Sequence, residues 1–194
     1  MDEIYNEFER TIAQIRQTND VYKYLKDVVK LNDAWIDDIL RSQIVNVISA
    51  LDRYLHEKVR KGICDMFLGN RAITNKFKSF SVSSDTVLRI WGDSSLTVID
   101  REILINEVVI QSLKTLSFQK AIKIKDALSY LWDEPHKMVV IAKEMEVPGI
   151  TDNDKQRYLT QKLDLLVERR NQIAHESDIY FGVKRGICQD DVID

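Results

Sequence analysis

The sequence predicts an all-α protein, and two observations carry that prediction. The 194 residues include only two prolines and six glycines, so few positions would interrupt a helix. Apolar side chains recur at intervals of three and four along most of the chain, which is the pattern of helices with one buried face. The composition shows no break between two cores, and we expect a single domain over residues 1–194.

Three helices are predicted in the first part of the chain. An amphipathic helix near the N-terminus is expected to end at Asn19, and a second is expected over residues 21–31. The longest apolar pattern runs over residues 35–59, and Gly62 is expected to stop it. Residues 64–96 carry repeated turn and cap residues, which predict short helices and loops.

Four more helices are predicted in the second part. Their expected ranges are 103–116, 118–132, 138–145 and a last helix that starts near Thr151 or Asp154 and reaches His175. The β-branched residues 108–110 would each suit a strand, but the periodicity around them favours a helix. Residues 190–194 resemble the start of a further helix, so we expect the domain to continue beyond residue 194.

Charge and cysteine content exclude several classes of protein. The chain has 28 basic and 31 acidic residues, which argues against a protein that coats nucleic acid over its whole surface. Any contact with nucleic acid should therefore be local. Cys64 and Cys188 are too few for a disulfide framework and lack the spacing of a zinc site. Charges interrupt every apolar run, and we expect a cytoplasmic protein that does not contact a membrane.

The last predicted helix carries the candidate functional residues. Arg170 interrupts its apolar stripe, whose other members are Leu159, Leu163, Leu166 and Ile173. A buried guanidinium needs an anionic partner, which the fold, a second chain or a ligand would supply. Glu168, Asn171 and His175 share a neighbouring face, so the first two residues could orient the histidine. The alternative is that Arg170 extends to solvent and His175 only caps the helix.

A wider pattern connects this helix to a known family. Residues 169–175 read RRNQIAH, and this arginine-to-histidine spacing with a polar residue after the arginine resembles the signature of the HEPN superfamily. Residues 48–57 (ISALDRYLHE) and 116–122 (LSFQKAI) resemble its RiboL-PSP branch. Arg169 also gives an allowed spacing, but Asn171 directly follows Arg170 and therefore selects Arg170.

The resemblance implies a HEPN-like bundle of long antiparallel helices with short helices in the middle. It also implies an endoribonuclease without metal or cofactor, in a toxin, antiviral-defence or RNA-processing setting. Arg170 would hold the phosphate and His175 would transfer protons, in a composite site formed by a homodimer. Some members of the superfamily have lost cleavage and only bind. A catalytically silent module that binds RNA or a partner protein is therefore the alternative function.

Three further features bear on the predicted function. Asp52 would orient a motif residue across the bundle, or would only form a local pair with His56 one turn away or a helix-helix contact. Tyr180 is a candidate for modification by an antitoxin or defence-system partner protein that silences the enzyme. Lysines would form an RNA-tracking patch or, as we favour, a solvated helix face; these are Lys114, Lys120, Lys123 and Lys125.

Overall fold

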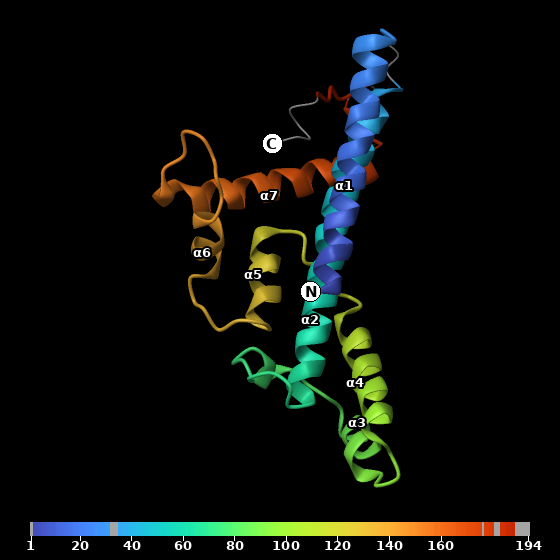
Figure 1. Ribbon diagram of the computed structural model, residues 1–194, viewed down its shortest axis with the longest axis vertical. Helices are drawn as coiled ribbons and strands as arrows, with labels where there is room; N and C mark the ends of the chain where they lie inside the picture. The colour runs from blue at the N-terminus through green and yellow to red at the C-terminus, as the bar shows by residue number, and fades with distance from the viewer. Residues whose placement is uncertain (1, 32–34, 176, 181–182, 189–194) are drawn as a thin grey trace. The chain divides into compact units, whose positions relative to one another are not determined.

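The all-α prediction is confirmed by a computed structural model of the chain (Figure 1). It describes residues 2–31, 35–175, 177–180 and 183–188. The predicted helix start at residues 190–194 lies outside these described residues. The α-helices are α1 (Glu3–Lys23), α2 (Asp37–Phe67), α3 (Ser84–Val87), α4 (Val98–Leu113), α5 (Ala121–Ser129), α6 (Lys137–Lys143) and α7 (Asp152–His175). The strands β1 (Ile179–Tyr180) and β2 (Val183–Lys184) pair as a short antiparallel hairpin, which the sequence did not predict.

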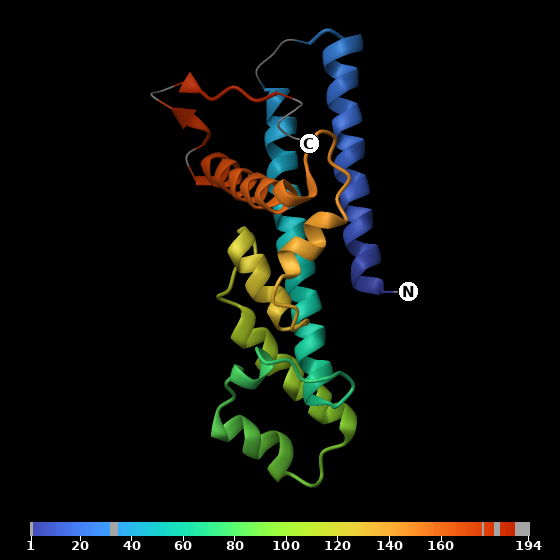
Figure 2. The same ribbon diagram turned by 90° about the vertical axis from the view of Figure 1, so that its left-hand side faces the viewer.

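Contacts along the chain divide it into two compact units. The first comprises residues 1–54 and 157–194, and the second comprises residues 55–156. In the first unit α1 lies beside the N-terminal part of α2, as both views show (Figures 1 and 2). Its core is the buried cluster of Tyr22, Ile36 and Leu40, against which Ile187 also packs. The segment after the hairpin therefore returns to the core of this unit.

The predicted break at Asn19 is wrong, because α1 continues through it to Lys23 and then through a π-helical turn, η1 (Tyr24–Val28). Asn19 is itself buried, between the buried side chains of Ile15 and Tyr22 on the same face. Asparagine lowers helix propensity by only about 0.7 kcal/mol relative to alanine. Burial of two large side chains on either side contributes more than that, so packing overrides the local signal.

The predicted stop at Gly62 is also wrong, since α2 runs on to Phe67. A Cβ at Gly62 would clash with the Cδ2 atom of Leu131 within the second unit. Glycine therefore allows Leu131 to approach the helix here. The chain turns away two residues after the helix end, at Gly69, whose φ of +76° is a conformation that glycine adopts without strain.

In the second unit, a core on α2 includes the buried residues Leu55, Val59 and Ile63. Helix α4 starts five residues before its predicted start, because Thr97 and Asp100 form a reciprocal capping box. Residues 64–96 do form short helical turns, namely α3, a 3-10 turn (Phe77–Ser79) and a π-helical turn, η3 (Leu88–Gly92). Aromatic rings hold these turns against the end of α2: the rings of Phe77, Phe80 and Trp91 lie 4.8, 5.9 and 6.0 Å from that of Phe67. Among the described residues, no helix is long and apolar enough to cross a membrane.

Candidate functional site

Helix α7 presents the predicted motif residues in the first unit. It ends at His175, as predicted, and the most buried member of its inner face is Val167, with 2% of its surface exposed. The apolar stripe on either side of Val167 is half-buried and consists of Leu159, Leu163, Leu166 and Ile173. Arg170 belongs to this stripe and is half-buried too. The sequence therefore placed the guanidinium on the correct side of the helix.

Arg170 is only partly satisfied by its surroundings. Its Nη1 donates a hydrogen bond of 3.0 Å to the Oδ1 atom of Asn171, the polar residue of the motif. Its Nε is buried and has no hydrogen-bond partner among the described residues. A buried donor without an acceptor costs about 1–3 kcal/mol. The side chain thus retains a hydrogen-bonding capacity that an anion or a second chain would satisfy.

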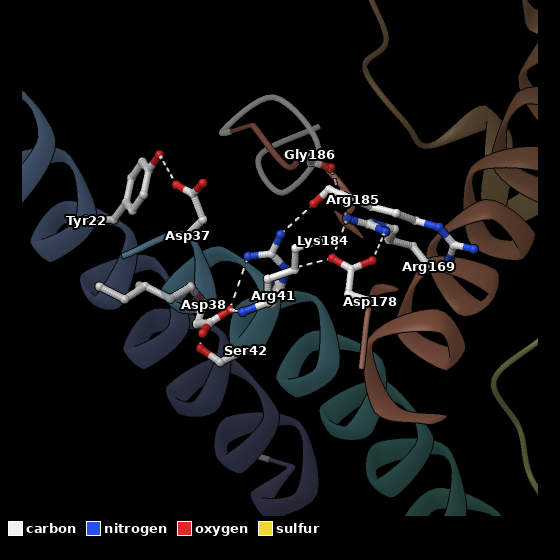
Figure 3. A network of polar contacts seen from close by, with 11 residues as sticks. Tyr22, Asp37, Asp38, Arg41, Ser42, Arg169, Asp178, Lys184, Arg185 and Gly186 are labelled. Atoms are coloured by element: carbon white, nitrogen blue, oxygen red, sulfur yellow. Dashed lines mark hydrogen bonds and ion pairs between the residues drawn. The ribbon is translucent and has the colours of Figure 1, made fainter. Parts of the chain in front are cut away.

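Arg169, its neighbour, is held by an ion pair within the first unit. Both of its terminal nitrogens bind the carboxylate of Asp178, Nη1 on Oδ1 and Nη2 on Oδ2, the second at 2.9 Å (Figure 3). Nη2 also donates to the carbonyl oxygen of Gly186 at 3.1 Å. This two-pronged geometry fixes the plane of the guanidinium. Arg169 therefore has a structural role in the fold.

The same carboxylate binds a second arginine. The Nε of Arg41, on α2, donates to Oδ2 of Asp178 at 2.6 Å, and its Nη2 donates to the carbonyl oxygen of Arg185 at 2.6 Å. Arg41 and Asp178 are 5% and 1% exposed, so this ion pair is buried. We call Arg41, Arg169 and Asp178 the buried triad (Figure 3). Loss of one partner from such a buried pair typically costs about 3–5 kcal/mol, because the remaining charge lacks a counter-ion.

His175 occupies the exposed C-terminal end of α7. It is five residues after Arg170, which at 100° per residue separates the two side chains by roughly 140° around the helix. Within the described part of the chain, no hydrogen bond joins these two residues. A single copy therefore does not assemble the arginine and the histidine into one contact.

The other predicted residues are less closely connected to the motif. Glu168 is exposed on α7, and Asp52 is half-buried on α2. The ring of His56, on α2, packs against that of Phe118 in the segment before α5, with centroids 4.5 Å apart, so this histidine takes part in packing. Tyr180 belongs to β1 and pairs with Val183. No three acidic, histidine or cysteine side chains of the described residues group as metal ligands.

An exposed charge pair attaches the hairpin to α2. Lys184 donates to the Oδ1 atom of Asp38 at 2.6 Å, and Arg41 binds the same oxygen at 3.1 Å. The hydrogen bond from Lys184 is the main cause that lowers the pKa of Asp38 below its ordinary value. A lowered pKa in the folded state means that the carboxylate stabilises the fold above its ordinary pKa. That contribution disappears as the pH falls through the lowered value.

We therefore expect Asp38→Asn to flatten the acid side of the stability profile. The effect should be small, a few tenths to about 1 kcal/mol, since the pair is exposed. This effect is measured by urea unfolding of the wild type and the variant at pH values from about 7 to about 3, which include the ordinary pKa of a carboxyl group. If the difference in unfolding free energy between the wild type and Asp38→Asn did not change with pH over this range, the stabilising role of the Asp38 carboxylate would be contradicted.

Sequence reasoning missed Arg41 and Asp178. Arg41 shares a helical stripe with the buried residues Ile44 and Ile48, and this is the same signal that identified Arg170. The position of an arginine on an apolar stripe can be read from the sequence, so this signal could have identified Arg41. Asp178 offered no comparable signal, because it follows the helix in a loop that the sequence leaves without a pattern. Only the fold connects it to a residue 137 positions earlier.

Comparison with known proteins agrees with the resemblance seen in the motifs. The family model described as RiboL-PSP-HEPN matches residues 4–194. Neither the curated proteins nor the solved structures include a significant match to this chain.

Proposed function

Because the chain belongs to the RiboL-PSP-HEPN family, we propose that it is an endoribonuclease with a composite site at a two-fold dimer. The observation that carries the proposal is the state of the two adjacent arginines. Arg169 is occupied by the buried triad, whereas Arg170 keeps a buried Nε–H without an acceptor. A phosphate oxygen is an acceptor that the guanidinium binds strongly. This difference supports Arg170 as the phosphate-binding residue.

The proposed chemistry requires two proton-transfer groups. The ribose 2′-oxygen forms a bond to the adjacent phosphorus while the bond from phosphorus to the 5′-oxygen breaks. One group takes the proton of the 2′-hydroxyl, and another gives a proton to the departing 5′-oxygen. Each chain supplies one motif histidine, so two copies of His175 would provide the base and the acid. Arg170 from each chain would stabilise the charge on the five-coordinate phosphorus.

The geometry of one chain supports the proposed two-fold arrangement. Arg170 and His175 are on different sides of α7, and His175 is exposed at its end. A second α7 placed across a two-fold axis would bring the histidine of one chain toward the arginine of the other. Asn171 would keep Arg170 oriented through the 3.0 Å hydrogen bond.

The products of such a reaction distinguish it from metal-dependent hydrolysis. We expect purified protein to cleave RNA in excess EDTA, because arginine and histidine supply the charge and the protons. The upstream fragment should end in a 2′,3′-cyclic phosphate, the downstream fragment should start with a 5′-hydroxyl, and DNA should remain intact. Mass spectrometry of the fragments is the measurement. Fragments with 5′-phosphates, or complete loss of cleavage on chelation, would contradict the mechanism.

A binding module is the second candidate. Its support is the same unsatisfied Nε of Arg170, which would bind a phosphate whether or not cleavage follows. The product assay separates the two functions. RNA that is bound in a filter assay but stays intact over hours would favour the module.

A further inference from the structure

Asp178 stands out among the residues near the motif because it is both charged and almost completely buried. It follows His175 by three positions, and only 1% of its surface is exposed. Its carboxylate accepts three hydrogen bonds from Arg41 and Arg169 (Figure 3). A side chain in this position cannot touch an RNA substrate. Any contribution to the site must act through other residues.

We propose that Asp178 is a positioning residue that sets the location of the His175 imidazole by anchoring the end of α7 to α2. The proposal rests on the role of His175 in the proposed function. Arg169 belongs to α7 and directly precedes Arg170, and Arg41 belongs to α2. The buried triad therefore anchors α7 beside Arg170 at one end of the motif and beyond His175 at the other.

The backbone around Asp178 closes the last turn of α7. The N–H of Asp178 donates to the carbonyl oxygen of Gln172 at 3.1 Å, and its own carbonyl accepts from the N–H of Arg185 at 2.8 Å. Ser177 and Asp178 have φ values of +51° and +58°, a conformation that residues other than glycine rarely adopt. Such a turn persists where surrounding contacts hold it. His175 lies between the two bonded positions, Gln172 and Asp178, so this hydrogen bond restrains the backbone around it.

The chemistry of the buried triad is better suited to positioning side chains than to merely holding two helices together. Apolar side chains would join two helices without the cost of removing three charges from water. Forked, charge-assisted hydrogen bonds add direction, since they fix both the distance and the plane of each guanidinium. Proton transfer needs this kind of precision, because an error of about 1 Å in a reacting group can lower a rate roughly 100-fold.

Asp178→Asn tests the proposal by kinetics. With a mixed-sequence single-stranded RNA labelled by a fluorophore and a quencher, we expect kcat to fall by roughly 10- to 100-fold. KM should change little, because Asp178 does not reach the RNA. Asp164→Asn, at an exposed carboxylate on the same helix, is the matched control and should keep wild-type kinetics. An active wild type whose kcat is unchanged by Asp178→Asn would overturn the proposal.

A second measurement needs no RNA. The chain has three histidines, so the imidazole signal of His175 is assigned in NMR spectra by its loss in His175→Ala. Asp178→Asn should shift or broaden this signal and leave that of His136 in place. If the wild type cleaves no RNA but the His175 signal moves, the proposed function fails while the positioning role is supported. A His175 signal that does not respond overturns the positioning role.

A milder variant covers the case in which Asp178→Asn does not fold. Arg41→Gln removes the direct contact of Asp178 with α2 and leaves Asp178 and Arg169 as a charge-balanced pair. The His175 signal should move again, and kcat should fall less than in Asp178→Asn. Wild-type kinetics together with an unmoved His175 signal in Arg41→Gln would overturn the proposal without reference to the first variant.

Discussion

His175→Ala and Arg170→Ala should each reduce RNA cleavage by about 100-fold or more. The histidine variant loses the group that transfers protons, a contribution of roughly 10²–10⁴ in rate. The arginine variant loses charge stabilisation at the phosphorus, a contribution of roughly 10²–10³. His175 is exposed, and Arg170 makes one side-chain hydrogen bond within the described residues, to Asn171. Both variants should therefore fold, which circular dichroism and thermal unfolding would show.

The control for these variants has to avoid Arg169. On sequence alone, Arg169→Ala looks like a matched variant that should keep most activity. In the structure Arg169 neutralises Asp178, so its removal would disturb the fold as well. Arg157→Ala, at an exposed arginine on the same helix, is the better control and should cleave at the wild-type rate. If His175→Ala or Arg170→Ala also cleaved at that rate, the role of that residue would be wrong.

An excess of His175→Ala protein should suppress the activity of the wild type. If each active site needs a histidine from both chains, only wild-type homodimers cleave. With nine parts of variant to one part of wild type and random exchange of subunits, about 1% of the dimers are wild-type homodimers. Activity per total protein should then fall to about 1% of the undiluted value. Simple dilution of independent sites would leave about 10%.

The mixing experiment needs evidence that subunits exchange. Two differently tagged copies, recovered together on either affinity resin, provide it. Light scattering at micromolar concentration independently reports the dimer. A strict monomer, or activity that follows simple dilution after proven exchange, would exclude the composite site and leave open a site built within one chain.

Local pattern was sufficient for much of the fold. The periodicity of apolar residues predicted the helical class, and the last long helix indeed starts in the predicted region and ends at His175. Where packing competes with a local signal, the prediction failed. Asn19 and Gly62 read as helix ends, yet both lie inside helices whose buried neighbours outweigh a propensity difference of at most about 1 kcal/mol.

The sequence by itself determined the all-α class, the family and the pair of arginines from which the motif is drawn. Only the tertiary structure decided how those arginines differ. Arg169 is bound because the chain reverses after α7 and carries Asp178 back to Arg41, a contact across 137 positions. Nothing in local periodicity encodes such a contact, since it depends on two helices packing and on two residues in left-handed conformations. Arg170, on the inner stripe of α7, keeps a buried Nε that has no hydrogen-bond partner among the residues the structure describes.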